Sequence, residues 1–67
     1  KLKRIVFEVS HQNPKVKLYW HLDNIYIGST QFQHRLAFIP DTGWHTLTVV
    51  DENGLSKSVH FEVVEGE

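Results

Sequence analysis

The chain has 67 residues and no cysteine, and its 7 basic and 8 acidic residues give a formal net charge of −1. A chain this short forms one domain, spanning 1–67, and buries only about 60% of its unfolded surface, so its core must be small. The balanced charge, with no clustered basic face, argues against nucleic-acid binding. No apolar run approaches the roughly 20 residues of a membrane-spanning helix. The sequence shows no signal peptide and no initiator methionine, as expected of a fragment of a larger protein.

The first strand is predicted over Lys3–Val9, where β-branched and aromatic residues gather. Ile5, Phe7 and Val9 alternate on the inward face. Val6 interrupts the polar outward face, so we expect it to meet a neighbour. An Asn-Pro pair then predicts a loop.

The second strand is predicted over Val16–Leu22, and its even-numbered apolar residues share one face: Val16, Leu18, Trp20 and Leu22. The Asp-Asn pair that follows suits a type I′ hairpin turn, because both residue types tolerate positive φ angles. The hairpin sets Leu22 opposite Ile25. It also sets Trp20 opposite Ile27, and all four residues then face inward.

The second half of the chain predicts a fourth strand and a final hairpin. His34–Ile39 places Leu36 and Phe38 inward, and a corner follows at 40–43. Strands at 44–51 and 55–63 then alternate apolar and polar residues around a three-residue loop.

The loop of this hairpin fixes its register. Gly54 takes the left-handed conformation, and Asp51 pairs with Leu55. The inward pairs are then Leu47–Val59 and His45–Phe61, and the outward pairs are Thr46–His60 and Trp44–Glu62.

Five or six short strands separated by turns, with no helical period, predict a sandwich or a small barrel. Two details favour an all-β, immunoglobulin-like antiparallel β-sandwich. Trp20 lies mid-strand, like the core tryptophan of that fold, and Asp41, Gly43 and His45 match the Asp-x-Gly-x-Tyr corner with histidine in the tyrosine position. We expect His45 to point inward and donate a hydrogen bond to corner backbone; the alternative is an exposed strand histidine. Trp20, His45, Gly43 and Gly54 are the predicted structural residues.

Four motifs carry a family resemblance across about residues 4–63. They are Tyr-Trp-His-Leu-Asp-Asn at 19–24, Ile-Gly-Ser-Thr at 27–30, His-Arg-Leu at 34–36, and the hairpin Gly-x-His-x-Leu with Asp-x-x-Gly at 43–54. Together they resemble the C-terminal accessory domain of 1C-type bifunctional penicillin-binding proteins, the peptidoglycan synthases of the bacterial envelope. The hairpin alone recurs in many immunoglobulin-like modules, whereas the first two motifs narrow the family considerably.

The resemblance implies a non-catalytic accessory module of cell-wall synthesis in a periplasmic or extracytoplasmic setting. Its partners would be the catalytic domains of the same polypeptide or another envelope protein, with peptidoglycan as the alternative ligand. The family domain usually begins with a strand ahead of Lys3–Val9, and this sequence lacks it. The resemblance therefore implies an unpaired sheet edge that is open to pairing with another chain.

The residues themselves predict no catalytic, cofactor or metal site. A transpeptidase of this class needs Ser-x-x-Lys and a Lys-Thr-Gly strand, and neither motif occurs. A glycosyltransferase needs acidic groups in a cleft, whereas the aspartates here fall mostly at turns. Strand geometry could bring His21 and His60 to one outer face with Thr46 between them, but two histidines without a third ligand make a poor zinc site. We expect solvent-facing strand histidines instead.

The aromatic residues are the better indication of function. Trp44, Tyr19 and Tyr26 fall on the outward parity of their strands and form the candidate contact surface. An exposed tryptophan with nearby tyrosines can anchor a protein partner or stack on sugar rings. The other readings are that Trp44 covers Glu62 as ordinary surface or meets the catalytic domain.

Overall fold

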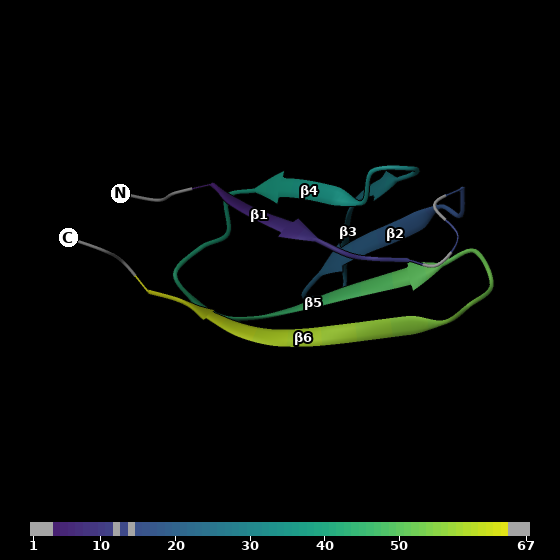
Figure 1. Cartoon of the computed structure of the whole chain (residues 1–67). Helices are drawn as coiled ribbons and strands as arrows, with labels where there is room; N and C mark the ends of the chain where they lie inside the picture. Colours follow the sequence, from purple (N-terminus) through teal and green to yellow (C-terminus); the bar gives the residue numbers. More distant parts are fainter. Residues whose placement is uncertain (1–3, 12, 14, 65–67) are drawn as a thin grey trace.

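The computed structural model describes residues 4–11, 13 and 15–64, which form two antiparallel β-sheets (Figure 1). The strands are β1 (Ile5–Glu8), β2 (Leu18–Leu22), β3 (Ile25–Thr30), β4 (Arg35–Phe38), β5 (Gly43–Asp51) and β6 (Ser56–Val63). β1 pairs with β4, and the other strands form a sheet in the order β3-β2-β5-β6. The smaller sheet lies above β5 and β6 in Figure 1. The predicted all-β sandwich is therefore confirmed.

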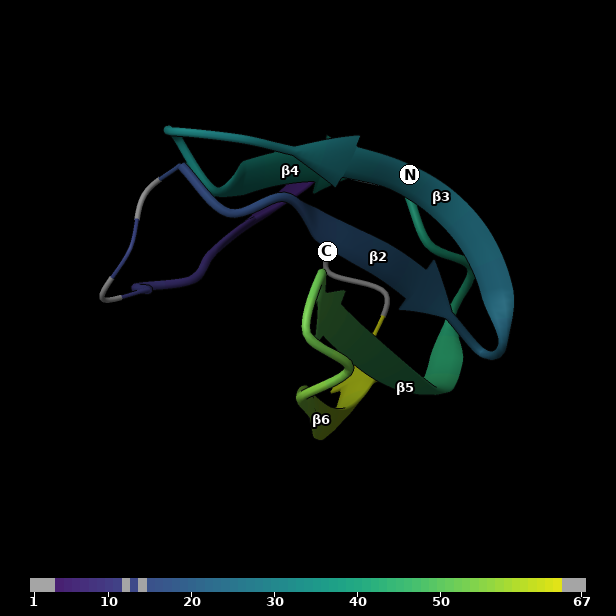
Figure 2. The same ribbon diagram turned by 90° about the vertical axis from the view of Figure 1, so that its right-hand side faces the viewer.

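The two layers meet on one side of the molecule between β3 and β4, and on the other side through the rings of Phe7 and Phe61. The larger sheet curls so that β3 contacts β4 (Figure 2). At the opposite side stand β1 and β6, and each of them pairs with a single strand of the described residues. All four edge strands of the described residues, β1, β4, β3 and β6, thus pair with one strand each, and the edges of β3 and β4 contact each other.

The strands form where the sequence predicts them, but most are shorter, whereas β5 begins at Gly43, which was predicted to belong to the corner. β1 begins at Ile5, and the predicted start at Lys3 lies outside the described residues, as do positions 12 and 14 of the predicted loop. β2 begins at Leu18, two residues after the predicted start at Val16. The N–H of Val16 instead donates to the carbonyl of Asn13 at 3.2 Å, which makes a turn ahead of the strand.

The β2–β3 hairpin departs from the predicted register. Its turn has the expected positive φ angles, and Leu22 lies opposite Ile25. A β-bulge after Trp20 then places Gly28, and not Ile27, opposite Trp20, so that pairing prediction is wrong. The inward placement of Ile25 is also wrong, because its side chain is 67% exposed. Ile25 begins the edge strand β3, where only one neighbouring strand covers it.

The β5–β6 hairpin confirms the predicted register throughout. His45 lies opposite Phe61 and Trp44 opposite Glu62. The N–H of Asp51 donates to the carbonyl of Leu55 at 2.9 Å, which closes the loop. Gly54 has φ 87°, a conformation that side chains with a Cβ atom rarely adopt, so glycine is needed there.

The core is small and centres on the inner face of β2 and β5. Leu18, Trp20 and Leu47 are buried, and Trp20 has no exposed surface. Partly buried apolar residues surround them: Phe7, Val9, Leu22, Ile27, Leu36, Phe38, Val49 and Phe61. Phe7 joins the layers, because its ring stacks on Phe38 of its own sheet at 5.6 Å and meets Phe61 of the other sheet at 5.1 Å. Such aromatic pairs contribute about 0.5–1.5 kcal/mol beyond their area burial.

The two tryptophans allow a matched stability test. Trp20→Phe leaves a partly filled site and removes the indole N–H that donates to Thr30, so we expect the free energy of unfolding to fall by about 1–3 kcal/mol. Trp44→Phe alters an exposed side chain, and we expect a change within about 0.5 kcal/mol. Urea denaturation followed by circular dichroism measures both. Equal losses in the two variants would contradict the assignment of Trp20 to the core.

Candidate functional site

The aromatic contact surface predicted from sequence lies on the outer face of the larger sheet. Trp44, at the start of β5, is 62% exposed and stacks on His60 of β6, with ring centroids 5.1 Å apart and an interplanar angle of 15°. Thr46 contacts the histidine of this pair, because its Oγ1 lies 2.9 Å from Nδ1 of His60. A flat indole–imidazole pair is therefore presented to solvent on two paired strands.

The two tyrosines do not join this pair. Tyr26 is exposed on β3 and packs edge-on against His21 at 5.6 Å. Tyr19 is half-buried and lies opposite Val50, six positions along β5 from Trp44. Six residues of strand span about 20 Å. The predicted surface is thus two separate sites, Trp44 with His60 and the tyrosine side of β2 and β3, and its role as a contact surface stays a prediction.

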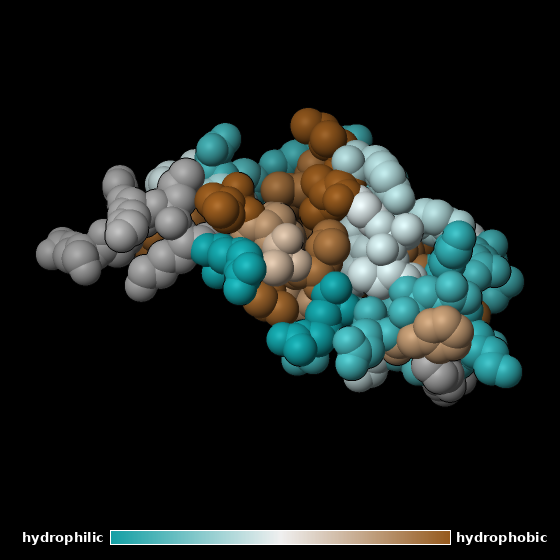
Figure 3. All heavy atoms as spheres, turned by 90° about the horizontal axis from the view of Figure 1, so that it is seen from above, coloured by the Kyte–Doolittle hydropathy of each residue, from teal (hydrophilic) through white to brown (hydrophobic). Residues whose placement is uncertain are grey.

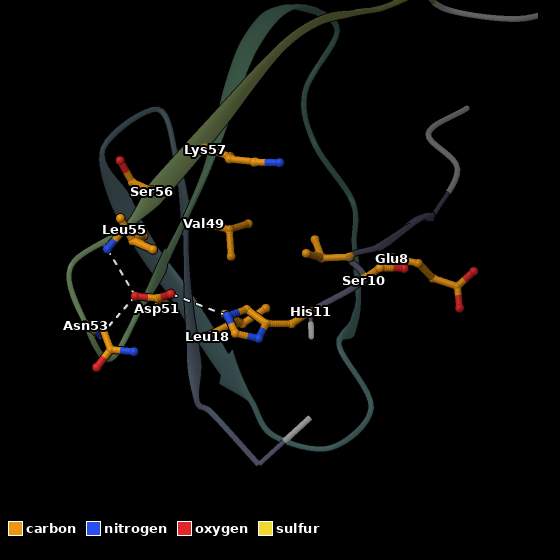
Figure 4. A pocket seen from close by; sticks show the side chains of 11 residues that line it. Glu8, Ser10, His11, Leu18, Val49, Asp51, Asn53, Leu55, Ser56 and Lys57 are labelled. Atoms are coloured by element: carbon orange, nitrogen blue, oxygen red, sulfur yellow. Dashed lines mark hydrogen bonds and ion pairs between the residues drawn. The ribbon is translucent and has the colours of Figure 1, made fainter. Parts of the chain in front are cut away.

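A groove lies between the two sheets near the β5–β6 loop. Its volume is about 750 Å³, and it lies between the end of β1 and the β5–β6 hairpin (Figure 4). Val9, Leu18, Val49 and Leu55 supply its apolar lining. Its size is within the range of about 300–1,000 Å³ that is typical of ligand sites. The sequence did not indicate this groove, because it joins segments about 40 residues apart.

Asp51 fixes the hairpin end of this groove. Its Oδ1 accepts the N–H of Asn53 at 2.8 Å and that of Leu55 at 3.0 Å, while its Oδ2 lies 3.3 Å from Nε2 of His11. Burial by itself raises the pKa of Asp51, but the hydrogen bonds from Leu55, His11 and Asn53 outweigh burial and bring the pKa below its usual range. A charged Asp51 thus ties the loop after β1 to the β5–β6 hairpin.

The corner before β5 confirms the predicted role of His45. Its side chain is only 11% exposed, its Nε2 donates to the carbonyl oxygen of Asp41 at 2.6 Å, and its Nδ1 lies 2.6 Å from Oδ2 of Asp23. The bond to Asp23, with that to Asp41, raises the pKa of His45. Oδ1 of Asp23 also accepts the N–H of Thr46 at 2.9 Å. The bond from Thr46, followed by that from His45, lowers the pKa of Asp23.

A buried histidine beside the core was missed from the sequence. His34 is 6% exposed, and its Nδ1 lies 2.9 Å from Oγ1 of Thr30. That oxygen accepts the indole N–H of Trp20 at 2.9 Å, so its own hydrogen is left to donate to His34. Nε2 of His34 is buried with no partner among the described residues. Burial lowers the pKa of His34, and the nearby His11 adds to this effect. The sequence signal was that His34 shares the even numbering of Leu36 and Phe38, the two residues predicted to face inward.

The described residues contain no group of three or more side chains placed to hold a metal ion. His21 and His60 do share the outer face of the larger sheet, where His21 lies opposite Thr48 and His60 opposite Thr46. Of the other histidines, His11, His34 and His45 each make the specific contacts described above.

Comparison with known proteins decides the family. The family model described as Penicillin-Binding Protein C-terminus Family matches residues 1–61, almost the whole chain. The chain belongs to this family. No curated protein and no solved structure matches it.

In this penicillin-binding protein C-terminal domain, the sequence motifs supply residues that stabilise the fold. The Tyr-Trp-His-Leu-Asp-Asn motif supplies the buried Trp20 and the turn carboxylate Asp23, which binds the corner through His45. The hairpin motif supplies Gly43, with φ 123°, and Gly54. These motif residues build the fold, whereas the groove and the indole–imidazole pair remain available for contacts. No helix among the described residues is long and apolar enough to cross a membrane.

The two internal histidines should titrate on opposite sides of the ordinary histidine pKa of 6.5. We expect the Cε1–H resonance of His45 to titrate above this value, since protonation gives it donors for both acceptors. That of His34 should titrate below it, since protonation places a charge in the core. A pH series of carbon–proton correlation spectra measures both. Coincident titration curves for His34 and His45 would contradict the described contacts.

The same groups set the pH dependence of stability. The pKa of His45 is higher in the folded state than in the unfolded state. Its contribution to folding stability is therefore fully present below pH 6.5 and is lost as pH rises through the folded pKa. The pKa of His34 is lower in the folded state than in the unfolded state. Its contribution to folding stability is therefore lost as pH falls from 6.5 through the folded pKa. We therefore expect a stability maximum near pH 6.5. Asp23→Asn should flatten the alkaline side and leave the loss from His34 below pH 6.5 in place, as urea midpoints across pH would show. An unchanged alkaline side would be evidence against the Asp23–His45 contact.

Proposed function

We propose that this domain is a non-catalytic accessory module of a bifunctional peptidoglycan glycosyltransferase/transpeptidase, which acts in cell-wall synthesis in a periplasmic or extracytoplasmic setting. The family match over residues 1–61 is the observation that carries the proposal. The sequence contains neither Ser-x-x-Lys nor Lys-Thr-Gly, which the transpeptidase chemistry of such enzymes uses. We therefore assign the glycosyltransferase and transpeptidase reactions to other domains of a parent synthase. The role assigned to this module is to contact other proteins or domains.

The module offers two features suited to protein contacts. Trp44 is a large, exposed aromatic side chain held in one orientation by His60, and tryptophan is enriched among the residues that dominate interface energies. The smaller sheet also carries exposed apolar side chains, including Val6 and Ile39, and apolar surface gathers on this side of the molecule (Figure 3). The partners we propose are the catalytic domains of the same polypeptide or another envelope protein.

Removal of the module from its parent synthase tests this function. We expect penicillin acylation and glycan polymerisation by the isolated catalytic domains to persist, because no group of the module enters either reaction. Recovery of envelope partners after cross-linking should fall by about tenfold, in proportion to the lost contact energy. Trp44→Ala in the intact synthase should give part of this loss, and Phe32→Ala, which removes an exposed aromatic ring between β3 and β4, is the matched control. Unchanged partner recovery after deletion would refute the accessory role.

Peptidoglycan binding is the second candidate function, and the flat Trp44–His60 pair favours it. Exposed aromatic rings stack on the apolar faces of sugars, as tryptophan and tyrosine do at many interfaces. Sedimentation with purified sacculi distinguishes the two proposals. A glycan-binding module should be retained at least about tenfold better than its Trp44→Ala variant. Equal retention of both proteins would remove this candidate and leave the protein-contact role.

A further inference from the structure

The outer face of β5 and β6 carries a row of hydrogen-bonded polar side chains beside Trp44. Thr46 and His60 form the first pair of this polar row, because Oγ1 of Thr46 lies 2.9 Å from Nδ1 of His60. Thr48 and Ser58 form the second pair, and their hydroxyl oxygens lie 2.9 Å apart. Both pairs join directly opposed residues of the β5–β6 register. The polar row therefore runs along the hairpin from the position of Trp44.

The polar row keeps hydrogen-bonding capacity that its internal contacts do not use. One hydroxyl of the Thr48–Ser58 pair donates to the other, which leaves one hydroxyl hydrogen and several oxygen lone pairs for other partners. His60 is bonded through Nδ1, so Nε2 is the ring nitrogen that a ligand can engage. Ser58 and His60 are both exposed, and a ligand can therefore reach these groups.

Trp44 places an apolar ring at the start of the polar row. One face of its indole is covered by His60, whose ring lies nearly parallel to it at 5.1 Å, and yet the side chain is 62% exposed. The exposed surface therefore belongs to the other face and the edges of the indole. Thr48 lies four residues along β5 from Trp44, and four residues of strand span about 13 Å. An apolar ring and a row of hydroxyl groups are thus combined over the length of a short linear ligand.

The charge of this face indicates the kind of ligand that it suits. The even-numbered residues of β5 and β6 form the face, and none of them is lysine or arginine. Glu62, which lies opposite Trp44, is the one carboxylate among them. A phosphate group or an acidic peptide would meet no lysine or arginine here and would be repelled by Glu62. An uncharged ligand with many hydroxyl groups and apolar C–H faces matches the side chains present.

We propose that the outer face of the β5–β6 hairpin binds an uncharged linear glycan. One sugar ring stacks on the free face of Trp44, and the following rings exchange hydrogen bonds with His60, Thr48 and Ser58. The aromatic contact supplies affinity, whereas the hydroxyl and imidazole groups fix the orientation of the sugar chain. The binding groups are side chains of two paired strands, so no strand edge is involved. The inference rests on the second candidate function and names its ligand as the sugar chain rather than the peptides of peptidoglycan.

Titration with an oligosaccharide, followed by nitrogen–proton correlation spectra, tests the proposal. The probe is N-acetylated chitotetraose, which is uncharged, and tetragalacturonate is the charged comparison with the same number of rings. We expect the uncharged probe to shift the indole N–H resonance of Trp44 and the amide resonances of Ser58 and His60. The indole N–H of Trp20 is the internal control, because it is buried and bonded to Thr30. The charged probe should bind at least about tenfold more weakly. Equal binding of the two probes, or an unmoved Trp44 resonance, would overturn the proposal.

Two substitutions separate the stacking contact from the hydrogen bonds. Trp44→Ala should weaken binding of the uncharged probe by about tenfold or more. Thr48→Val keeps a β-branched side chain but removes a hydroxyl, so binding should weaken by about threefold to tenfold. Phe32→Ala, which removes an exposed aromatic ring between β3 and β4, is the control and should leave binding unchanged. Full binding by either Trp44→Ala or Thr48→Val would overturn the proposed site.

The ligand class and the proposed function are judged by different results. Retention on sacculi that depends on Trp44, without binding of the chitotetraose, would move the ligand to the peptides of peptidoglycan and overturn this inference alone. Binding of the chitotetraose without retention on sacculi would support the glycan site and remove peptidoglycan as the source of its ligand. The protein-contact role is tested by partner recovery and does not depend on either result.

Discussion

The structure depends on the hydrogen-bonded burial of Trp20. Its ring fills the centre of a core in which Leu18 and Leu47 are the other buried apolar side chains of the described residues, and its indole N–H donates to Thr30. Thr30 in turn bonds to His34, which precedes β4. One side chain thus links β2, β3 and the segment that delivers β4 to the opposite layer. Burial of a tryptophan contributes about 3–5 kcal/mol, which exceeds the cost of about 1–3 kcal/mol for the unpartnered nitrogen of His34.

Because the core is small, short hydrogen bonds between polar groups also stabilise the fold. The Asp23 carboxylate at the β2–β3 turn accepts from both His45 and the backbone of Thr46, so one hairpin is bonded to the corner of the other. The Asp51 carboxylate does the same at the far end, where it bonds the β5–β6 loop to His11. Each aspartate anchors a turn of the larger sheet to a segment distant in sequence. The two ends of the sandwich are held by charged hydrogen bonds, and its middle by apolar packing.

The groove and the Trp44–His60 pair are surface features beside the buried core and the two aspartate contacts. The edges of β3 and β4 contact each other, whereas the groove lies between the end of β1 and the β5–β6 hairpin. Family membership and the missing synthase motifs are the observations on which the proposed accessory role rests. The indole–imidazole pair of Trp44 and His60 is a second, separate surface, because it lies on the outer face of the larger sheet. The groove and the Trp44–His60 pair are therefore two separate surface features of one small domain.

The local sequence determined the strands, the turns and the β5–β6 register, because alternation and turn chemistry act between near neighbours. It also placed Trp20 inside, Trp44 outside and His45 at the corner. It missed the bulge that sets Gly28 opposite Trp20, since an extra residue in a strand leaves alternation almost unchanged. Burial of His34, the His11–Asp51 contact and the groove were decided only by tertiary structure. Each joins segments that periodicity cannot relate, and it is the packing of one sheet on the other that brings them together.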